Sequence, residues 1–157
     1  MTASNNSIPV TAEIIAVGTE ILLGDLVDTN SVYLAEKLRG IGVHLHLKTA
    51  VGDNLQRLTA AIAEAHKRAD IVITSGGLGP TVDDLTREAI AAVAEVPLVY
   101  SQKFMDQIEA IFTQRGFTMS SNNRKQAYIP EGAVPIENPV GTAPCFAVED
   151  EQGTIIA

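Results

Sequence analysis

The chain alternates short apolar runs with longer segments of helical periodicity. The apolar runs have the length of buried strands and cover residues 12–17, 43–51 and 70–74. Apolar residues at helical spacing follow each run and predict helices at about 28–39, 53–68, 84–96 and 101–115. This order of strands and helices predicts an α/β fold with a parallel sheet covered by helices on both faces.

The last third of the chain is less regular. A short helical turn is predicted at 122–127, and short strands at 143–148 and 154–156. Four prolines exclude a long helix between them: Pro130, Pro135, Pro139 and Pro144. The polar, short-chained residues 1–11 predict a disordered N-terminal tail, which leaves a single domain over 12–157.

Two of the helix starts carry capping signals. Asp28 is an N-cap candidate for the helix at 28–39, and Asp53 with Gln56 three residues later resembles a capping box. The segment between Gly18 and Thr29 is predicted to be a loop, although Ile21–Leu23 within it are apolar. These side chains are expected to pack under a ligand or against a partner subunit.

Ligands of open parallel sheets bind beyond the carboxyl ends of the strands. Two loops leave such ends, at 18–29 after the first strand and at 75–84 after the third. We expect these loops to lie side by side and to form the functional site.

Composition narrows the classes of function. The 157 residues include 11 Lys and Arg against 19 Asp and Glu, giving a net charge of −8, and no Trp. Nucleic-acid binding depends on clustered basic side chains, so no nucleic-acid partner is expected. The start of the sequence has neither the basic nor the apolar region of a signal peptide, so none is expected. No apolar run reaches membrane-spanning length, and the single cysteine fits a reducing cytoplasm. A cytoplasmic protein with no membrane partner is therefore expected.

The most informative stretch is the glycine-rich loop after the third strand. Its candidate ligand-binding residues are Ser75, Gly76, Gly77, Gly79 and Thr81. Glycines permit positive φ and close approach of a ligand, and exposed amides before a helix bind anions. The spacing matches neither the dinucleotide fingerprint nor the Walker A loop, and an ordinary turn is the alternative.

Carboxylates flank the same loop. Asp83 and Asp84 could cap the following helix, or they could hold a divalent cation that offsets their repulsion of a bound phosphate. Polar side chains of the first loop would face the same site: Glu20, Asp28 and Asn30. Capping by Asp28 and Asn30 and solvation of Glu20 are the alternatives.

Two later segments could complete the site. Lys125 lies in a polar turn and could contact a phosphate, although a solvated basic pair with Arg124 is the more common outcome for such a dipeptide. The loop containing Asn138, Gly141 and Thr142 could present amides to a ligand or form a plain turn.

Four segments together resemble a known family. They are AEIIAVGTEILLGDLVDTN at 12–30, ITSGGLGPTVDDLT at 73–86, NRKQAYIPEGA at 123–133 and ENPVGTAPCF at 137–146. In this order they resemble the N-terminal domain of the competence/damage-inducible CinA proteins, of the molybdopterin-binding MoaB/MogA-like superfamily. The resemblance covers essentially 12–157. It implies a three-layer α/β/α fold with a mostly parallel sheet and a pocket at the carboxyl ends of its strands.

The resemblance also implies an activity, the metal-dependent hydrolysis of the pyrophosphate of ADP-ribose-type nucleotides. It places Asp84, Asp83 and Lys125 among the catalytic residues and Asp84 and Glu20 at a magnesium-like ion. Other residues would bind substrate: Glu20, Asp28, Asn30, Ser75, Gly76, Gly77, Gly79, Thr81, Asn138, Gly141 and Thr142. A non-catalytic module that binds a nucleotide or a pterin phosphate is the alternative, and a homodimer is expected in either case. A third possibility is a domain that serves oligomerisation with a missing partner.

The sequence departs from the family pattern at two places. Cys145 stands where the family usually has Gly, and it would be strained if that position required positive φ. The chain ends at Ala157, where the family continues through a Pro-Gly-Val-Pro turn, so the domain is expected to be truncated and to lack the C-terminal amidohydrolase domain of many members.

Overall fold

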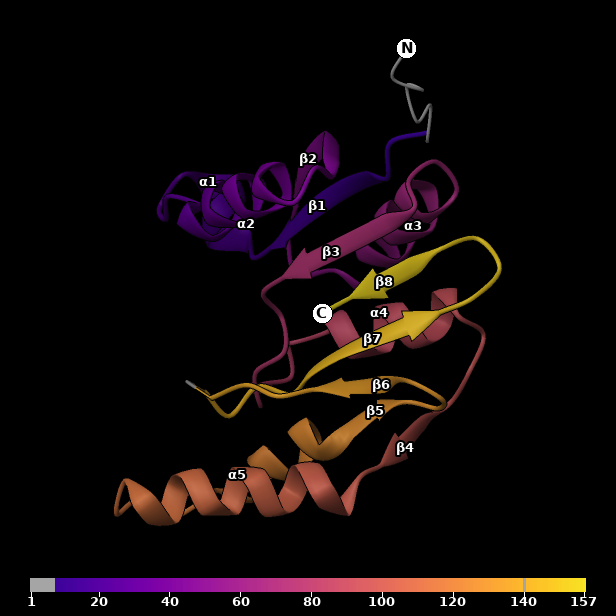
Figure 1. Ribbon diagram of the computed structural model, residues 1–157. Helices are drawn as coiled ribbons and strands as arrows, with labels where there is room; N and C mark the ends of the chain where they lie inside the picture. Colours follow the sequence, from indigo (N-terminus) through magenta and orange to yellow (C-terminus); the bar gives the residue numbers. More distant parts are fainter. Residues whose placement is uncertain (1–7, 140) are drawn as a thin grey trace.

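A six-stranded mixed sheet forms the centre of the computed structural model, which describes residues 8–139 and 141–157 (Figure 1). Its strands in spatial order are β2 (His44–Val51), β1 (Thr11–Val17), β3 (Ile71–Ser75), β8 (Thr154–Ile156), β7 (Cys145–Glu149) and β6 (Val134–Ile136). The first four are parallel, whereas β7 and β6 are antiparallel to their neighbours. The mostly parallel sheet is thus confirmed.

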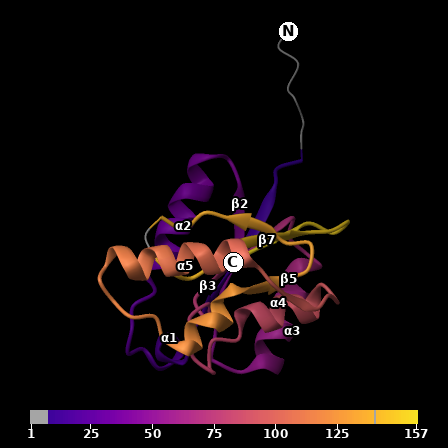
Figure 2. The same ribbon diagram turned by 90° about the horizontal axis from the view of Figure 1, so that it is seen from below.

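Helices flank this sheet, and a two-stranded antiparallel sheet lies beside it (Figure 2). The helices are α1 (Thr19–Leu23), α2 (Thr29–Gly40), α3 (Leu55–His66), α4 (Thr86–Val93), α5 (Gln102–Gln114) and the 3-10 helix η1 (Ser121–Ala127). The small sheet pairs β4 (Leu98–Tyr100) with β5 (Tyr128–Pro130).

The core lies in two layers because β1 is buried on both faces. Ile14 packs with Leu38 of α2 in the smaller cluster on one face. Ile15 packs with Leu58 of α3 and Ile90 of α4 in the larger cluster on the other. Alternate residues of one strand therefore face opposite helical layers, which confirms the predicted α/β/α arrangement.

The first predicted loop is partly helical. Residues 19–23 form α1 and not an open loop, and the helix ends at Gly24 with φ 80°. Leu22 and Leu23 are exposed by 52% and 71%. These two side chains therefore do not pack into the core of the chain. Their expected contact with a ligand or a partner subunit stays a prediction, and so does the homodimer.

The helix caps differ from the prediction at two of three sites. Asp28 caps α2 by accepting a hydrogen bond from the Ser31 amide at 3.0 Å, as expected. Asn54 and not Asp53 caps α3. Helix α4 starts two residues later than predicted and has no side-chain cap, so neither Asp83 nor Asp84 fills that role.

Three short strands were not predicted, namely β4, β5 and β6. Pro130 and Pro135 lie in two of them, which is tolerated because these three-residue strands lie at sheet edges. Strand β7 begins at Cys145, and Cys145 does not have positive φ, so the substitution causes no backbone strain there.

The predicted tail 1–11 falls largely outside the described residues, which begin at Ile8, and Thr11 already belongs to β1. Within residues 8–139 and 141–157, none of the helices combines the length and the apolar character that a bilayer crossing requires.

Candidate functional site

The two predicted loops meet at one edge of the sheet because β1 and β3 are adjacent and parallel. The Asn30 side chain donates a hydrogen bond to Ser75 Oγ at 3.2 Å, which ties the start of α2 to the end of β3. Between the loops lies a cavity of about 180 Å³ that we call the acidic cavity. It is lined by Val17, Gly18, Glu20, Asp53, Gly77, Thr81, Asp83 and Asp84.

Asp53 lines this cavity and does not cap α3, so its predicted role as a helix cap is wrong. Its Oδ2 accepts a hydrogen bond from the Thr19 amide at 2.9 Å, and its own amide donates to Thr19 Oγ1 at 3.1 Å. This reciprocal pair fixes α1 against the loop after β2. The signal was available, since Asp53 follows the carboxyl end of a strand parallel to β1.

The glycine loop presents unoccupied amides. Gly76 and Gly77 have φ of 108° and 66°, which favours glycine. Within the part of the chain that the structure describes, the amides of Gly76, Gly77 and Leu78 have no hydrogen-bond acceptor. Successive free amides of this kind form an anion-binding concavity, so the predicted anion site has the donors it needs.

Asp84 is held inside the loop. Its Oδ2 accepts hydrogen bonds from the Thr81 amide at 2.8 Å and from Thr81 Oγ1 at 2.6 Å. Burial raises the pKa of Asp84, but these bonds and the Gly79 amide outweigh it, so the pKa lies below its ordinary value of 3.8. Asp84 is therefore ionised at neutral pH and takes part in shaping the loop.

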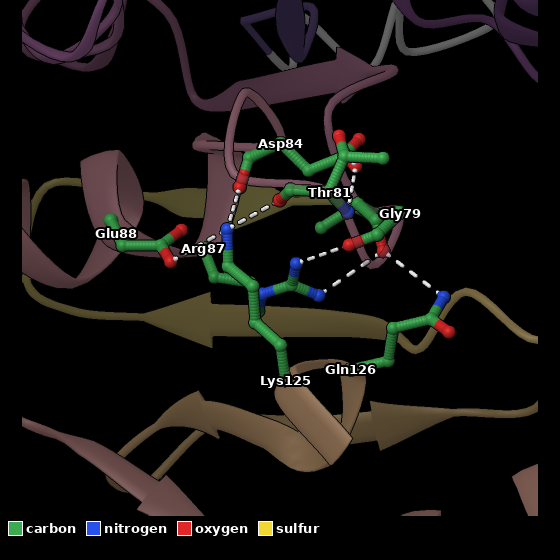
Figure 3. Close-up of polar contacts among 8 residues, drawn as sticks. Gly79, Thr81, Asp84, Arg87, Glu88, Lys125 and Gln126 are labelled. Atoms are coloured by element: carbon green, nitrogen blue, oxygen red, sulfur yellow. Dashed lines mark hydrogen bonds and ion pairs between the residues drawn. The ribbon is translucent and has the colours of Figure 1, made fainter. Parts of the chain in front are cut away.

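Cationic and amide side chains hold the carbonyl groups of the same loop (Figure 3). Arg87 is fully buried and donates to the carbonyls of Leu78 and Gly79 at 3.1 and 2.7 Å. Gln126 donates to the Leu78 carbonyl at 3.4 Å. Sequence reasoning missed both residues, because a helical Arg or Gln carries no sign of its target.

Lys125 lies with this group and does not line the acidic cavity. Its Nζ donates to the carbonyls of Thr81 and Asp84 at 2.9 and 2.6 Å, and it lies 3.3 Å from Glu88 Oε1. Three acceptors therefore already surround the ammonium group that was predicted to contact a phosphate.

The predicted residues of the late loop do not line the acidic cavity. Asn138 donates to the Ala143 carbonyl at 3.0 Å and accepts from the Gly141 amide at 3.1 Å. Together with Thr142 these residues line a second cavity, of about 190 Å³, against α5. Gln126 is the link between the regions, since its amide also lies 3.5 Å from Thr142 Oγ1.

The remaining predicted residue, Asp28, is engaged elsewhere. It caps α2 and forms an ion pair with Lys48 at 3.0 Å. Burial raises the pKa of Asp28, but the hydrogen bonds from Ser31 and Lys48 lower it by more. The pKa therefore lies below its ordinary value of 3.8.

The carboxylates of the acidic cavity form only part of a metal site. Among residues 8–139 and 141–157, no three or more His, Cys, Asp or Glu side chains are arranged to hold a metal ion. Mg²⁺ ordinarily takes one or two carboxylates and completes its shell with water and substrate phosphates. Glu20 and Asp84 line one cavity together with Gly77, whose amide is free, so the residues present fit an ion that arrives with a phosphate.

Comparison with known proteins places this chain in a family. The model of the family described as "probable molybdopterin binding domain" matches residues 13–157. A protein of Halothermothrix orenii named for competence-damage induction is 55% identical over 146 residues, which are 93% of this chain and 35% of that protein. The chain thus spans about a third of the length of such relatives.

Solved structures agree with this placement. The crystal structure of the protein CinA from Thermoplasma acidophilum has a TM-score of 0.82 and 34% identity, and the match covers 93% of this chain and 85% of that one. The molybdopterin biosynthesis enzyme MoaB of Thermus thermophilus shares the fold, with a TM-score of 0.58 at 15% identity over 94% of this chain and 79% of that one.

Proposed function

Because the chain belongs to the molybdopterin-binding-domain family as a CinA-type N-terminal domain, we propose that it binds the diphosphate of an ADP-ribose-type nucleotide and hydrolyses it with a divalent cation. One observation carries this proposal. The acidic cavity brings Gly77, whose amide is free, together with the carboxylates of Glu20, Asp53, Asp83 and Asp84. Amides alone would suit any anion, whereas amides beside carboxylates suit an anion that brings a cation with it.

In the proposed reaction a water molecule adds to one phosphorus of the diphosphate. The bridging oxygen leaves with the other phosphate, which gives AMP and ribose phosphate from ADP-ribose. The amides of Gly76–Leu78 would hold the phosphate oxygens, and Glu20 and Asp84 would hold the cation, which when bound neutralises negative charge on them. A carboxylate that remains free in the cavity would accept the proton of the attacking water.

A second candidate is a binding module without turnover, for a nucleotide or a pterin phosphate. One observation favours it. Lys125, which was predicted to contact a phosphate, is bound to loop carbonyls and to Glu88. This chain covers about a third of the longer relatives. Their activity therefore supports neither candidate over the other.

The two candidates differ in products. The chain is incubated with ADP-ribose and Mg²⁺, and with EDTA as the metal-free control, and nucleotides are separated by chromatography. AMP and ribose phosphate are expected only with Mg²⁺. Saturable binding by calorimetry without any product under several divalent metals would support the binding module and contradict hydrolysis.

The matched variants are Asp84→Asn and Asp106→Asn. The asparagine oxygen at 84 can still accept the Thr81 hydrogen bonds, so the loop is kept while the charge is lost. Turnover is expected to fall at least about 100-fold. Asp106 is an exposed carboxylate on α5 that binds Gln102, and its variant should retain full activity. Equal turnover of the two variants would remove Asp84 from the catalytic site.

A further inference from the structure

Thr86 is a fully buried polar residue that opens α4 directly behind the glycine loop. It holds two successive carbonyls of that loop. Its Oγ1 donates to the Gly76 carbonyl at 2.8 Å, and its backbone amide donates to the Gly77 carbonyl at 3.1 Å. The sequence alone does not indicate this role for Thr86.

Peptide geometry links these carbonyls to the free amides. In a trans peptide the C=O and N–H groups point to opposite sides of the chain. The carbonyl of Gly76 shares its peptide with the amide of Gly77, and the carbonyl of Gly77 shares its peptide with the amide of Leu78. Thr86 therefore turns both amides away from α4, and neither finds an acceptor within residues 8–139 and 141–157.

Close packing keeps the two peptides in this orientation. A methyl group at Gly77 would overlap Thr86 Oγ1, and one at Gly76 would overlap the Val17 carbonyl. The loop is thus clamped between the end of β1 and the start of α4. Its amides are oriented before any ligand arrives, which lowers the entropic cost of binding.

The neighbouring Arg87 acts on different peptides. It holds the carbonyl of Leu78, which shares its peptide with the Gly79 amide, and the carbonyl of Gly79, whose peptide continues into Pro80 and has no N–H. The Gly79 amide serves Asp84 and lowers the pKa of that carboxylate. Arg87 thus orients a donor that the protein uses itself, whereas Thr86 orients the donors that remain free.

We propose that Thr86 is a positioning residue for phosphate, because its hydroxyl and amide direct the N–H groups of Gly77 and Leu78 toward the bound diphosphate. The inference rests on the proposed function in one respect, that the glycine loop binds phosphate. It is independent of turnover.

The test measures binding of pyrophosphate with Mg²⁺ by calorimetry and by the amide signals of ¹⁵N-labelled protein. In the wild-type chain the Gly77 and Leu78 amides are expected to shift on titration. Thr86→Val removes one buried hydrogen bond and should weaken binding roughly tenfold. Thr86→Ser keeps the hydroxyl and should restore affinity close to that of the wild type.

Thr74→Val is the matched control. Thr74 is also buried, and its hydroxyl donates to the Ile156 carbonyl of β8 at 3.3 Å and not to a carbonyl of the glycine loop. A general loss of stability would affect Thr74→Val and Thr86→Val alike, whereas positioning affects the affinity of Thr86→Val alone. Equal pyrophosphate affinity of these two variants would overturn the inference.

The outcomes separate the inference from the proposed function. If the wild-type chain binds pyrophosphate but no product forms from ADP-ribose, catalysis fails and the role of Thr86 stands. If pyrophosphate binds without a shift of the Gly77 and Leu78 amides, the role of Thr86 is wrong while the acidic cavity remains a binding site. If pyrophosphate does not bind at all, both are wrong.

Discussion

The glycine loop at 75–84 and the late loop at 137–145 are alike in sequence and opposite in structure. Both contain glycine, proline and small polar residues, and both were predicted to bind ligand. In the glycine loop, side chains from α4 and η1 take the carbonyls and leave amides free. In the late loop, Asn138 takes the Gly141 amide and the Ala143 carbonyl, so the loop closes on itself.

The difference shows what makes an anion site. Glycine permits the backbone conformation, but the site depends on what occupies the carbonyls. Where buried donors outside the loop bind the carbonyls, the amides are held outward and remain available. Where one side chain within the loop binds both an amide and a carbonyl, as Asn138 does, those two groups are no longer open to a ligand.

The largest expected effect follows from Arg87, the buried cation that holds the glycine loop. Arg87→Met leaves the Leu78 and Gly79 carbonyls without their charged donor, so the free energy of unfolding should fall by about 3 kcal/mol. Urea unfolding measures this. Arg39→Met, on the exposed end of α2, should change stability by no more than about 0.5 kcal/mol. A small loss at Arg87 would mean that the loop is held by its own conformation.

A smaller effect contrasts one glycine from each loop. Gly77→Ala introduces a side chain at φ 66° that meets Thr86 Oγ1, and it should destabilise the chain by about 2 kcal/mol. It should also abolish pyrophosphate binding, because the peptide must rotate. At Gly141 the nearest atom to an added Cβ is the side-chain nitrogen Nδ2 of Asn138, at 3.3 Å. Gly141→Ala should therefore change stability by less than about 0.5 kcal/mol and leave binding intact, as calorimetry and thermal unfolding would show. Equal losses from both substitutions would end the distinction between the loops.

The sequence predicted the part of the site that depends on local pattern. The apolar runs at 12–17 and 70–74 located β1 and β3, and their adjacency brought Glu20, Gly77 and Asp84 to one cavity. The resemblance to the CinA family supplied the mostly parallel sheet that the structure confirms.

The rest depended on contacts between distant segments. The hydrogen bonds of Gln126 and Lys125 to the glycine loop span more than 40 residues, and no local pattern reports them. Asp53 lies just before a helix, as an N-cap residue would, but its position beside Thr19 comes from the pairing of β2 with β1. The late loop was assigned to the site from its composition, and its internal hydrogen bonds became visible only in the folded chain.

The smallest expected effect is a pH dependence that belongs to the glycine loop. The pKa of Asp84 is lowered in the folded chain, so its hydrogen bonds to Thr81 contribute stability that is fully present above about pH 3.8 and lost as pH falls through the folded pKa. Asp28, Asp70 and Asp150 also have lowered pKa values and contribute to acid unfolding in the wild type. Asp84→Asn removes only one of these carboxylates. The stability of this variant should therefore fall slightly less steeply below pH 4 than that of the wild type.

Urea unfolding of the two proteins between pH 2.5 and 6, as a range about the ordinary carboxyl pKa, measures the difference in slope. Asn138→Ala in the late loop is the control, because it changes hydrogen bonds of a neutral side chain and should lower stability equally at every pH. Parallel pH profiles for Asp84→Asn and the wild type would mean that the Asp84 carboxylate gains nothing from Thr81. The glycine loop would then be held by its carbonyl donors alone, and the difference between the two loops would reduce to those donors, which are Thr86, Arg87, Lys125 and Gln126.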